Sequence, residues 1–146
     1  MMVPKFRAWD ETQHKMLQVD CIEFIDGKAY WVEASPADGT VQGGNDGSIG
    51  DNSQLKLEQY TGLKDANGKD IYEGDILAWH SNIYRKQDWV GLVLYRGAGF
   101  AVQESDKSYS SPEWLDCACR KDANIIEVIG NIHENPELLE EENERN

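Results

Sequence analysis

The sequence predicts a mainly β protein, in which a small N-terminal antiparallel unit precedes a small antiparallel barrel or sandwich. Short apolar runs rich in β-branched and aromatic residues recur along the chain, and turn residues separate them. Few segments show the periodicity of a long helix. The 146 residues are enough for one compact domain or two very small ones.

The first predicted element is a small antiparallel sheet over residues 5–33. Residues 5–10 alternate charged and apolar side chains, as a half-buried strand does. Residues 16–17 lead into a run over 19–25 that is rich in β-forming residues, and Asp26-Gly27 follows it as a turn. Residues 28–33 are expected to return as the second strand of a hairpin. We assign residues 1–34 to this N-terminal β unit.

The composition changes sharply after this unit. Residues 35–54 contain five glycines, and their branched apolar residues are only Val41 and Ile49. Such a stretch buries too little apolar surface to offset the entropy lost on ordering. A mobile loop or linker is therefore predicted over residues 35–54.

Short strands are predicted again from residue 55 to residue 133. Asn67-Gly68 favours a tight turn, because both residues tolerate positive φ, and Glu73-Gly74-Asp75 breaks the chain before an apolar run. Closing these strands into a barrel would remove exposed sheet edges. The candidate strands are residues 55–60, 76–80, 89–95, 100–103 and 125–132.

Two short helices are predicted from their capping residues. Ser111-Pro112-Glu113 and Asn135-Pro136-Glu137 each place a cap residue, a first-turn proline and an acidic residue in order. The acidic residue lies near the positive end of the helix dipole. Residues 134–146 hold six acidic residues and one basic residue, so they are expected to form an acidic helix and tail.

Composition limits the classes of function. The formal net charge is −13, and no cluster of Lys and Arg suited to a phosphate backbone is visible, which disfavours nucleic-acid binding. The mean hydropathy is −0.64, and no apolar run approaches the roughly 20 residues of a membrane span. Three cysteines without an apparent export signal suggest a reducing cytosol rather than a disulfide framework.

No catalytic residue, metal or cofactor is predicted. Cys117-Ala118-Cys119 is the nearest approach to a zinc half-site, but the other candidate ligands are scattered singly, so free thiols are favoured. The glycine- and aspartate-rich loop lacks most of the ligands of a calcium-binding loop.

Aromatic residues between 79 and 95 are the best candidates for a recognition surface. Stacking and a polar tip both help such side chains to bind a partner. The alternative is that Trp79, Trp89 and Tyr95 fill a small core, which we favour for Trp89. The candidate binding residues are Trp79, His80, Tyr84 and Tyr95.

Three segments together resemble the YopX family of phage and prophage proteins. They are residues 5–10, the block from Gln59 to Ile76, and residues 127–139. The resemblance implies that residues 55–133 form an SH3-like barrel, with the N-terminal strands as a smaller β unit beside it. It also implies a phage or prophage gene and work in the cytoplasm of a bacterial host. It supplies no activity and no catalytic residues.

These observations favour a non-enzymatic interaction module that binds an unknown host or phage protein. The acidic flanks could attract a basic partner, although solubility is the plainer explanation for them. The alternatives are a small metal-dependent hydrolase or nuclease using Asp75 with Glu73 or Asp70, and a barrel associated with nucleic acid. The composition is also compatible with a homo-oligomer.

Overall fold

A computed structural model describes residues 5–36, 44–49, 53–81, 89–96, 99–104 and 124–139. The chain divides into two compact units, Met1–Tyr60 and Thr61–Asn146. This division falls inside strand β5 (Leu55–Lys64), whereas the barrel was predicted to begin at residue 55. Two sheets contain the described strands, and every strand pair with a described register is antiparallel.

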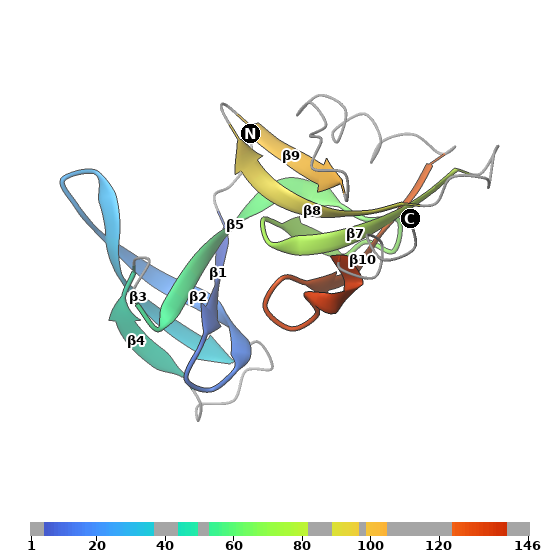
Figure 1. The fold of residues 1–146 in the computed structure, drawn as a ribbon. Coiled ribbons are helices and arrows are strands. Elements are labelled where there is room, and N and C mark those ends of the chain that lie inside the picture. Colours follow the sequence, from blue (N-terminus) through green and yellow to red (C-terminus); the bar gives the residue numbers. More distant parts are fainter. Residues whose placement is uncertain are drawn as a thin grey trace. The chain divides into compact units, whose positions relative to one another are not determined.

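The first unit is built around a long hairpin (Figure 1). Asp26 and Gly27 both take positive φ, 53° and 80°, as a tight hairpin turn between twisted strands requires. In the six-stranded sheet the strand order is β4-β3-β2-β1-β5-β6. The strands of this unit besides β5 are β1 (Phe6–Asp10), β2 (Lys15–Ile25), β3 (Lys28–Pro36) and β4 (Asn45–Ser48).

One face of this sheet carries the core of the first unit. Leu17, Val32, Ala34 and Leu55 are buried together there. Their positions follow from the register, because Leu17 pairs with Pro36 and Ile22 pairs with Val32 on the same face. The alternation predicted from the sequence thus produces a sheet with one apolar face.

Strand β4 lies inside the segment 35–54, for which a loop or linker was predicted. It pairs with β3 from Asn45↔Ala34 to Ser48↔Trp31. A Cβ atom on Gly47 would lie 3.3 Å from Leu55, so glycine lets the strand approach the core closely. Residues 37–43 and 50–52 of that segment lie outside the described residues.

The second unit contains a hairpin and a four-stranded sheet with the order β10-β7-β8-β9. The chain leaves the first sheet at the end of β6 and enters the second at the start of β7, across Glu73 and Gly74. Its strands besides the end of β5 are β6 (Asp70–Tyr72), β7 (Asp75–Ser81), β8 (Trp89–Arg96), β9 (Gly99–Glu104) and β10 (Asn124–Asn131).

A second core joins the two sheets within this unit. Ile71 of β6 packs with four buried side chains of the four-stranded sheet, and Leu63 of β5 packs against the cluster. The four are Leu77, Val93, Val102 and Ile126. The mainly β prediction is therefore confirmed. The described residues show an open sheet with β9 and β10 at its edges, and not a closed barrel.

Helical structure is slight in the described residues. Residues 137–139 are helical, as Asn135-Pro136-Glu137 predicts. The helix predicted at Ser111-Pro112-Glu113, and the Cys117 and Cys119 thiols, lie outside the described residues. No helix in the described part of the chain is long and apolar enough to cross a membrane.

Asp10 is a buried acid at the end of β1. Its carboxylate accepts hydrogen bonds from the backbone N–H groups of Thr12 at 2.9 Å and Gln13 at 3.1 Å. The side-chain amides of Gln13 and Asn45 donate to it at 2.7 and 3.1 Å. Burial raises the pKa of Asp10, but these hydrogen bonds to the charged form outweigh it, so the pKa is lowered.

The lowered pKa of Asp10 predicts an acid dependence of stability. Its folded pKa lies below the ordinary value of 3.8, so the ionised carboxylate stabilises the folded protein above that pH. This contribution is lost as the pH falls through the folded pKa. Asp10→Asn should lower the free energy of unfolding by about 1–3 kcal/mol at neutral pH, and the deficit should shrink below pH 3.8.

Urea denaturation followed by circular dichroism across this pH range measures the effect. Glu11→Gln, at an exposed neighbouring position, is the control and should leave the pH dependence as it is in the wild type. A deficit for Asp10→Asn that stays constant with pH would show that the charge of Asp10 does not contribute.

Candidate functional site

The structure places the predicted aromatic residues in different surroundings. Trp79 is partly buried and packs against the core of the second unit. His80 pairs with Ile125 through the backbone, but its side chain and all of Tyr84 lie outside what is described. Tyr95 is 53% exposed and makes an edge-to-face contact with Phe100, with ring centroids 5.1 Å apart. The described side chains thus show one exposed member of this set.

The carboxylates proposed for metal chemistry have other partners. Asp75 is buried, and its Oδ2 accepts the backbone N–H of Tyr72 at 2.8 Å. Asp70 forms an exposed ion pair with Lys64, at 2.6 Å between Oδ1 and Nζ. Among the described residues, no group of three or more His, Cys, Asp or Glu could hold a metal ion.

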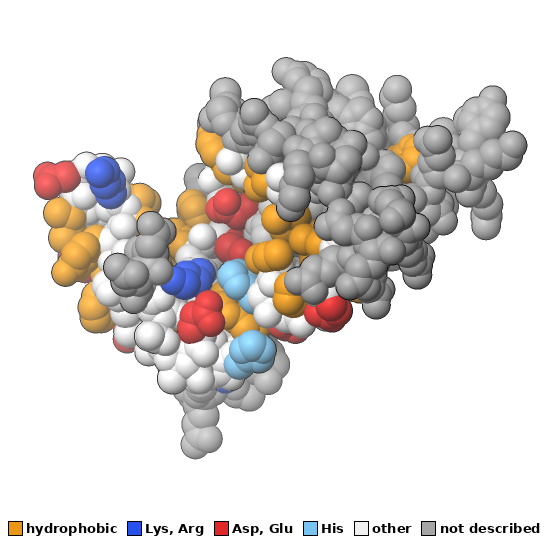
Figure 2. All heavy atoms as spheres, in the orientation of Figure 1, with side chains coloured by type: hydrophobic (Ala, Val, Ile, Leu, Met, Phe, Trp, Pro, Cys, Tyr) orange, Lys and Arg blue, Asp and Glu red, His pale blue; other side chains and the backbone are white. Residues whose placement is uncertain are grey.

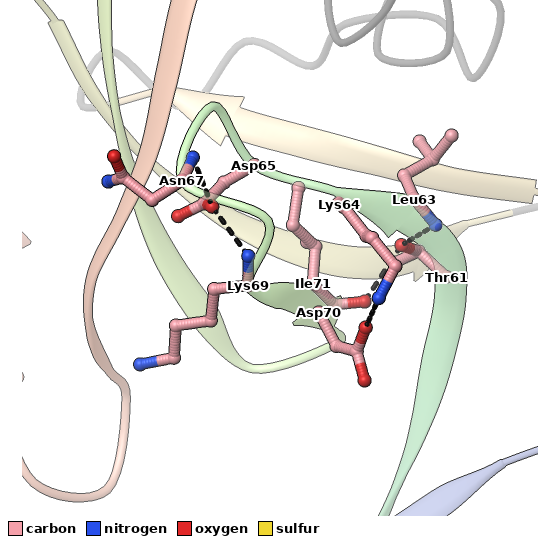
Figure 3. Close-up of polar contacts among 8 residues, drawn as sticks. All are labelled: Thr61, Leu63, Lys64, Asp65, Asn67, Lys69, Asp70 and Ile71. Atoms are coloured by element: carbon pink, nitrogen blue, oxygen red, sulfur yellow. Dashed lines mark hydrogen bonds and ion pairs between the residues drawn. The ribbon is translucent and has the colours of Figure 1, made fainter.

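Asp65 organises the turn between β5 and β6 (Figure 3). Asp65 is 8% exposed, and its Oδ1 accepts the backbone N–H groups of Asn67 at 2.9 Å and Lys69 at 2.8 Å. Oδ2 accepts the N–H of Val128 in β10 at 3.0 Å. The turn predicted at Asn67-Gly68 is present, and Gly68 takes positive φ in it whereas Asn67 does not. The Asp65 carboxylate, which the sequence analysis did not single out, organises this turn.

Thr61 and Gly74 also support the backbone. The Thr61 hydroxyl donates to the carbonyl of Ile71 at 2.7 Å and accepts the N–H of Leu63 at 3.1 Å. The N–H of Gly74 donates to the carbonyl of Val93, and its own carbonyl accepts the N–H of Ile132, both at 2.8 Å. Hydrogen bonds to β8 and to the residue that follows β10 therefore fix the backbone at Gly74, where the chain passes from one sheet to the other.

The third motif segment, residues 127–139, also supports the backbone, in the turn that follows β10. Asn131 Oδ1 accepts the N–H groups of His133 and Glu134 at 3.0 and 2.9 Å. A Cβ atom on Gly130 would lie 2.5 Å from Asn135 Oδ1, so a side chain there would displace Asn135. Like Asp65 and Thr61, Asn131 thus uses its side chain to hold a turn or a strand end.

The clearest exposed apolar surface is on the β2–β3 hairpin of the first unit. Phe24 is 59% exposed, Tyr30 52%, Ile25 46% and Trp31 38%. We call these four residues the hairpin patch. Figure 2 shows hydrophobic side chains gathered along this hairpin, below a charged tip. Large exposed apolar side chains gathered in one element mark interaction surfaces more often than scattered ones do.

The patch is exposed because the hairpin extends beyond its neighbours. Strand β1 pairs with β2 only from Lys15 to Gln18. Strand β4 pairs with β3 from Trp31 to Ala34, and the N–H of Ile49 just beyond β4 donates to the carbonyl of Tyr30 at 2.9 Å. Phe24 and Ile25 lie beyond the described pairing of both β1 and β4, and an isolated two-stranded ribbon is marginally stable in water. The outer hairpin therefore carries apolar side chains with no described core to cover them.

A sequence signal for this patch exists. Residues 29–32 are four consecutive apolar residues, and 22–25 interrupt their apolar run only at Glu23. A strand that is half exposed normally alternates, so an unbroken run indicates apolar side chains on both faces. Prediction from the sequence assigned the hairpin to the fold and placed the binding residues in the second unit.

Comparisons with known proteins agree with the resemblance seen in the motifs. The family model described as YopX protein matches residues 5–140. Protein EF1440 from Enterococcus faecalis is similar in structure, with a TM-score of 0.63, 30% identity, and coverage of 95% of this chain and 99% of its own. Protein yopX from Bacillus subtilis is similar with a TM-score of 0.57, 20% identity, and coverage of 92% and 96%. No curated protein matches.

The network around Asp65 predicts a difference between two acids of one hairpin. Asp65→Asn should lower the free energy of unfolding by about 2 kcal/mol, because an amide cannot serve three N–H donors as a buried carboxylate does. Asp70→Asn is the matched control and should cost less than about 1 kcal/mol, since its ion pair with Lys64 is exposed. Urea denaturation measures both, and equal losses would contradict the structural role of Asp65.

Proposed function

This chain belongs to the YopX family, and from that premise we propose that it is a non-enzymatic protein-interaction module. The hairpin patch is the observation that carries the proposal. Phe24, Ile25, Tyr30 and Trp31 are exposed together in one element. Aromatic side chains of this kind contribute most of the binding energy at many protein interfaces.

The contacts of the family motifs also support the proposal, because they are structural. Asp65, Thr61 and Asn131 direct their polar atoms at backbone groups of their own chain. A catalytic group must instead face a substrate or a reacting atom. The described contacts of these motif residues are those of structural residues, which leaves the hairpin as the surface open to a partner.

We propose further that the second unit is an SH3-like barrel. Its support is the core in which Ile71 of β6 packs against Leu77 and Val93 of the four-stranded sheet. The change of sheet at Gly74 is a corner of the kind that such a barrel needs. In this proposal the surface with Trp79, His80, Tyr84 and Tyr95 is a second binding face, secondary to the hairpin because fewer of its side chains are described as exposed.

We also propose that a phage or prophage gene encodes the protein and that it acts in the cytoplasm of a bacterial host. The support is the motif resemblance to YopX proteins of phages and prophages. In this setting the partner is a host or phage protein. The hydrolase or nuclease alternative is less well supported, because Asp75 accepts a backbone N–H group and Asp70 pairs with Lys64.

Capture from host lysate tests the interaction function. The wild-type protein and Ile129→Thr should retain one specific partner, whereas the double variant Phe24→Thr/Trp31→Thr should bind it at least about tenfold more weakly. Ile129 is the matched control, because it is an exposed large apolar residue in the other unit, outside both proposed binding surfaces. Retention of no specific partner by the wild type would contradict the proposal, and so would equal binding by the double variant.

Calorimetry tests the metal-dependent alternative. Titration of the protein with Mg²⁺, Mn²⁺ or Ca²⁺ should give no saturable heat, since the carboxylates of Asp75 and Asp70 are engaged within the chain. Saturable binding in the wild type that Asp75→Asn abolishes, in a variant that still folds by circular dichroism, would favour the hydrolase or nuclease instead.

A further inference from the structure

One face of the hairpin combines an indole with carboxylates. Glu23 of β2 lies directly opposite Trp31 of β3, so their side chains share a face of the sheet. Glu33 is two residues beyond Trp31 and therefore lies on that face as well. Asp46 of β4 is directly opposite Glu33 and shares it too. We call Glu23, Trp31, Glu33 and Asp46 the acidic face.

The acidic face looks away from the core of its own unit. The row between these residues, Ile22 opposite Val32, packs on the core side. Side chains alternate between the faces of a strand, so the neighbouring rows lie on the other side. All four residues of the acidic face are exposed.

The charges on this face are not neutralised within the described chain. Glu33 and Asp46 lie directly opposite each other, and like charges in that position destabilise a sheet. No described ion pair involves Glu23, Glu33 or Asp46. The nearby Arg7 is already paired with Glu58, at 2.9 Å between Nε and Oε1. A cation from outside would remove this repulsion.

The same hairpin is acidic as a whole. Residues 20–33 contain four acidic residues and one basic residue, Lys28. The whole chain carries a net charge of −13, so a second copy would bring like charges together at this surface. A phosphate backbone would meet the same repulsion. Charge complementarity therefore selects a basic polypeptide as the occupant.

The indole of Trp31 favours arginine over lysine as the bound cation. A guanidinium group stacks on an aromatic face and can donate to a carboxylate at the same time. Trp31 between Glu23 and Glu33 provides both contacts for one arginine. Lysine could pair with the carboxylates, but it presents a compact, strongly hydrated charge rather than a planar group.

The edge of β2 favours an extended segment. Strand β1 ends its described pairing with β2 at Gln18, and a groove of about 330 Å³ lies at this edge. Its lining, which includes one acidic and one basic side chain, is Lys5, Phe6, Val19, Asp20, Cys21 and Ile22. A strand added beside β2 would alternate its side chains between the two faces. Arginines would meet the acidic face, and apolar residues would meet the side that carries Phe24 and Ala29.

We propose that the outer β2–β3 hairpin binds an extended segment of a partner protein in which arginine alternates with apolar residues. One arginine stacks on Trp31 between Glu23 and Glu33, and the segment lies along β2. This inference rests on the proposed interaction function and adds the chemistry of the partner.

Fluorescence anisotropy with short labelled peptides tests it. The probe is a fluorescein-labelled peptide of alternating arginine and leucine. It should bind the full-length protein at low salt and weaken as salt is added. Trp31→Thr and the double variant Glu23→Gln/Glu33→Gln should each weaken binding about tenfold. The matched controls Ile129→Thr and Glu11→Gln, at exposed positions outside the hairpin, should bind as the wild type does.

Two further peptides test whether the guanidinium group itself is required or whether any positive charge is enough. A peptide with lysine in place of arginine should bind more weakly, and one with glutamate in place of arginine should not bind. The proposal is overturned if the wild type does not bind the arginine peptide, or if either hairpin variant binds it as tightly as the wild type. Equal binding of the glutamate peptide also overturns it.

The lysate experiment distinguishes this inference from the function on which it rests. A captured partner that binds Glu23→Gln/Glu33→Gln and Trp31→Thr as well as the wild type would leave the interaction function standing and overturn the arginine segment. Loss of the partner in those variants, with retention by Ile129→Thr and Glu11→Gln, supports both.

Discussion

The buried carboxylate of Asp65 is the constraint on which the second unit depends. Backbone N–H groups that are removed from water need hydrogen-bond acceptors. The Asp65 carboxylate accepts three such groups, two from its own turn and one from a strand far away in the sequence. The N–H of Ala66 adds a bond to the carbonyl of Ile126 at 2.8 Å. The turn is thereby tied to β10 where its register shifts, and Ile71 and Ile126 can meet in one core.

This arrangement separates what holds the fold from what is available to a partner. Thr61, Asp65 and Gly74 satisfy backbone groups within the second unit. The side chains of Phe24 and Ile25 are exposed, because this end of the hairpin extends beyond the described pairing of β1 and β4. Under the proposed interaction function, changes on the hairpin surface would alter the choice of partner while the motifs continue to maintain the fold.

Much of the fold follows from local sequence, and the rest depends on distant contacts. Alternation predicted β1, and Asp26-Gly27 predicted the long hairpin. Strands β4 and β6 were not predicted, because they are short and become strands only through their neighbours in the sheet. The exposure of Phe24 depends on where β1 and β4 end, which no pattern within the hairpin reveals. Composition alone likewise could not show that Trp79 packs against a core while Phe24 is exposed.

Residue-resolved hydrogen exchange of the free protein, followed by NMR, tests the central claim that the motifs are structural and the hairpin is open. The amides of Lys69 and Val128, which donate to Asp65, should exchange nearly as slowly as that of Leu77 in the core. The amides of Phe24 and Ile25, which lie beyond the described pairing of β1 and β4, should exchange far faster, through local opening of the hairpin. Exchange at Lys69 and Val128 as fast as at the hairpin would contradict this account.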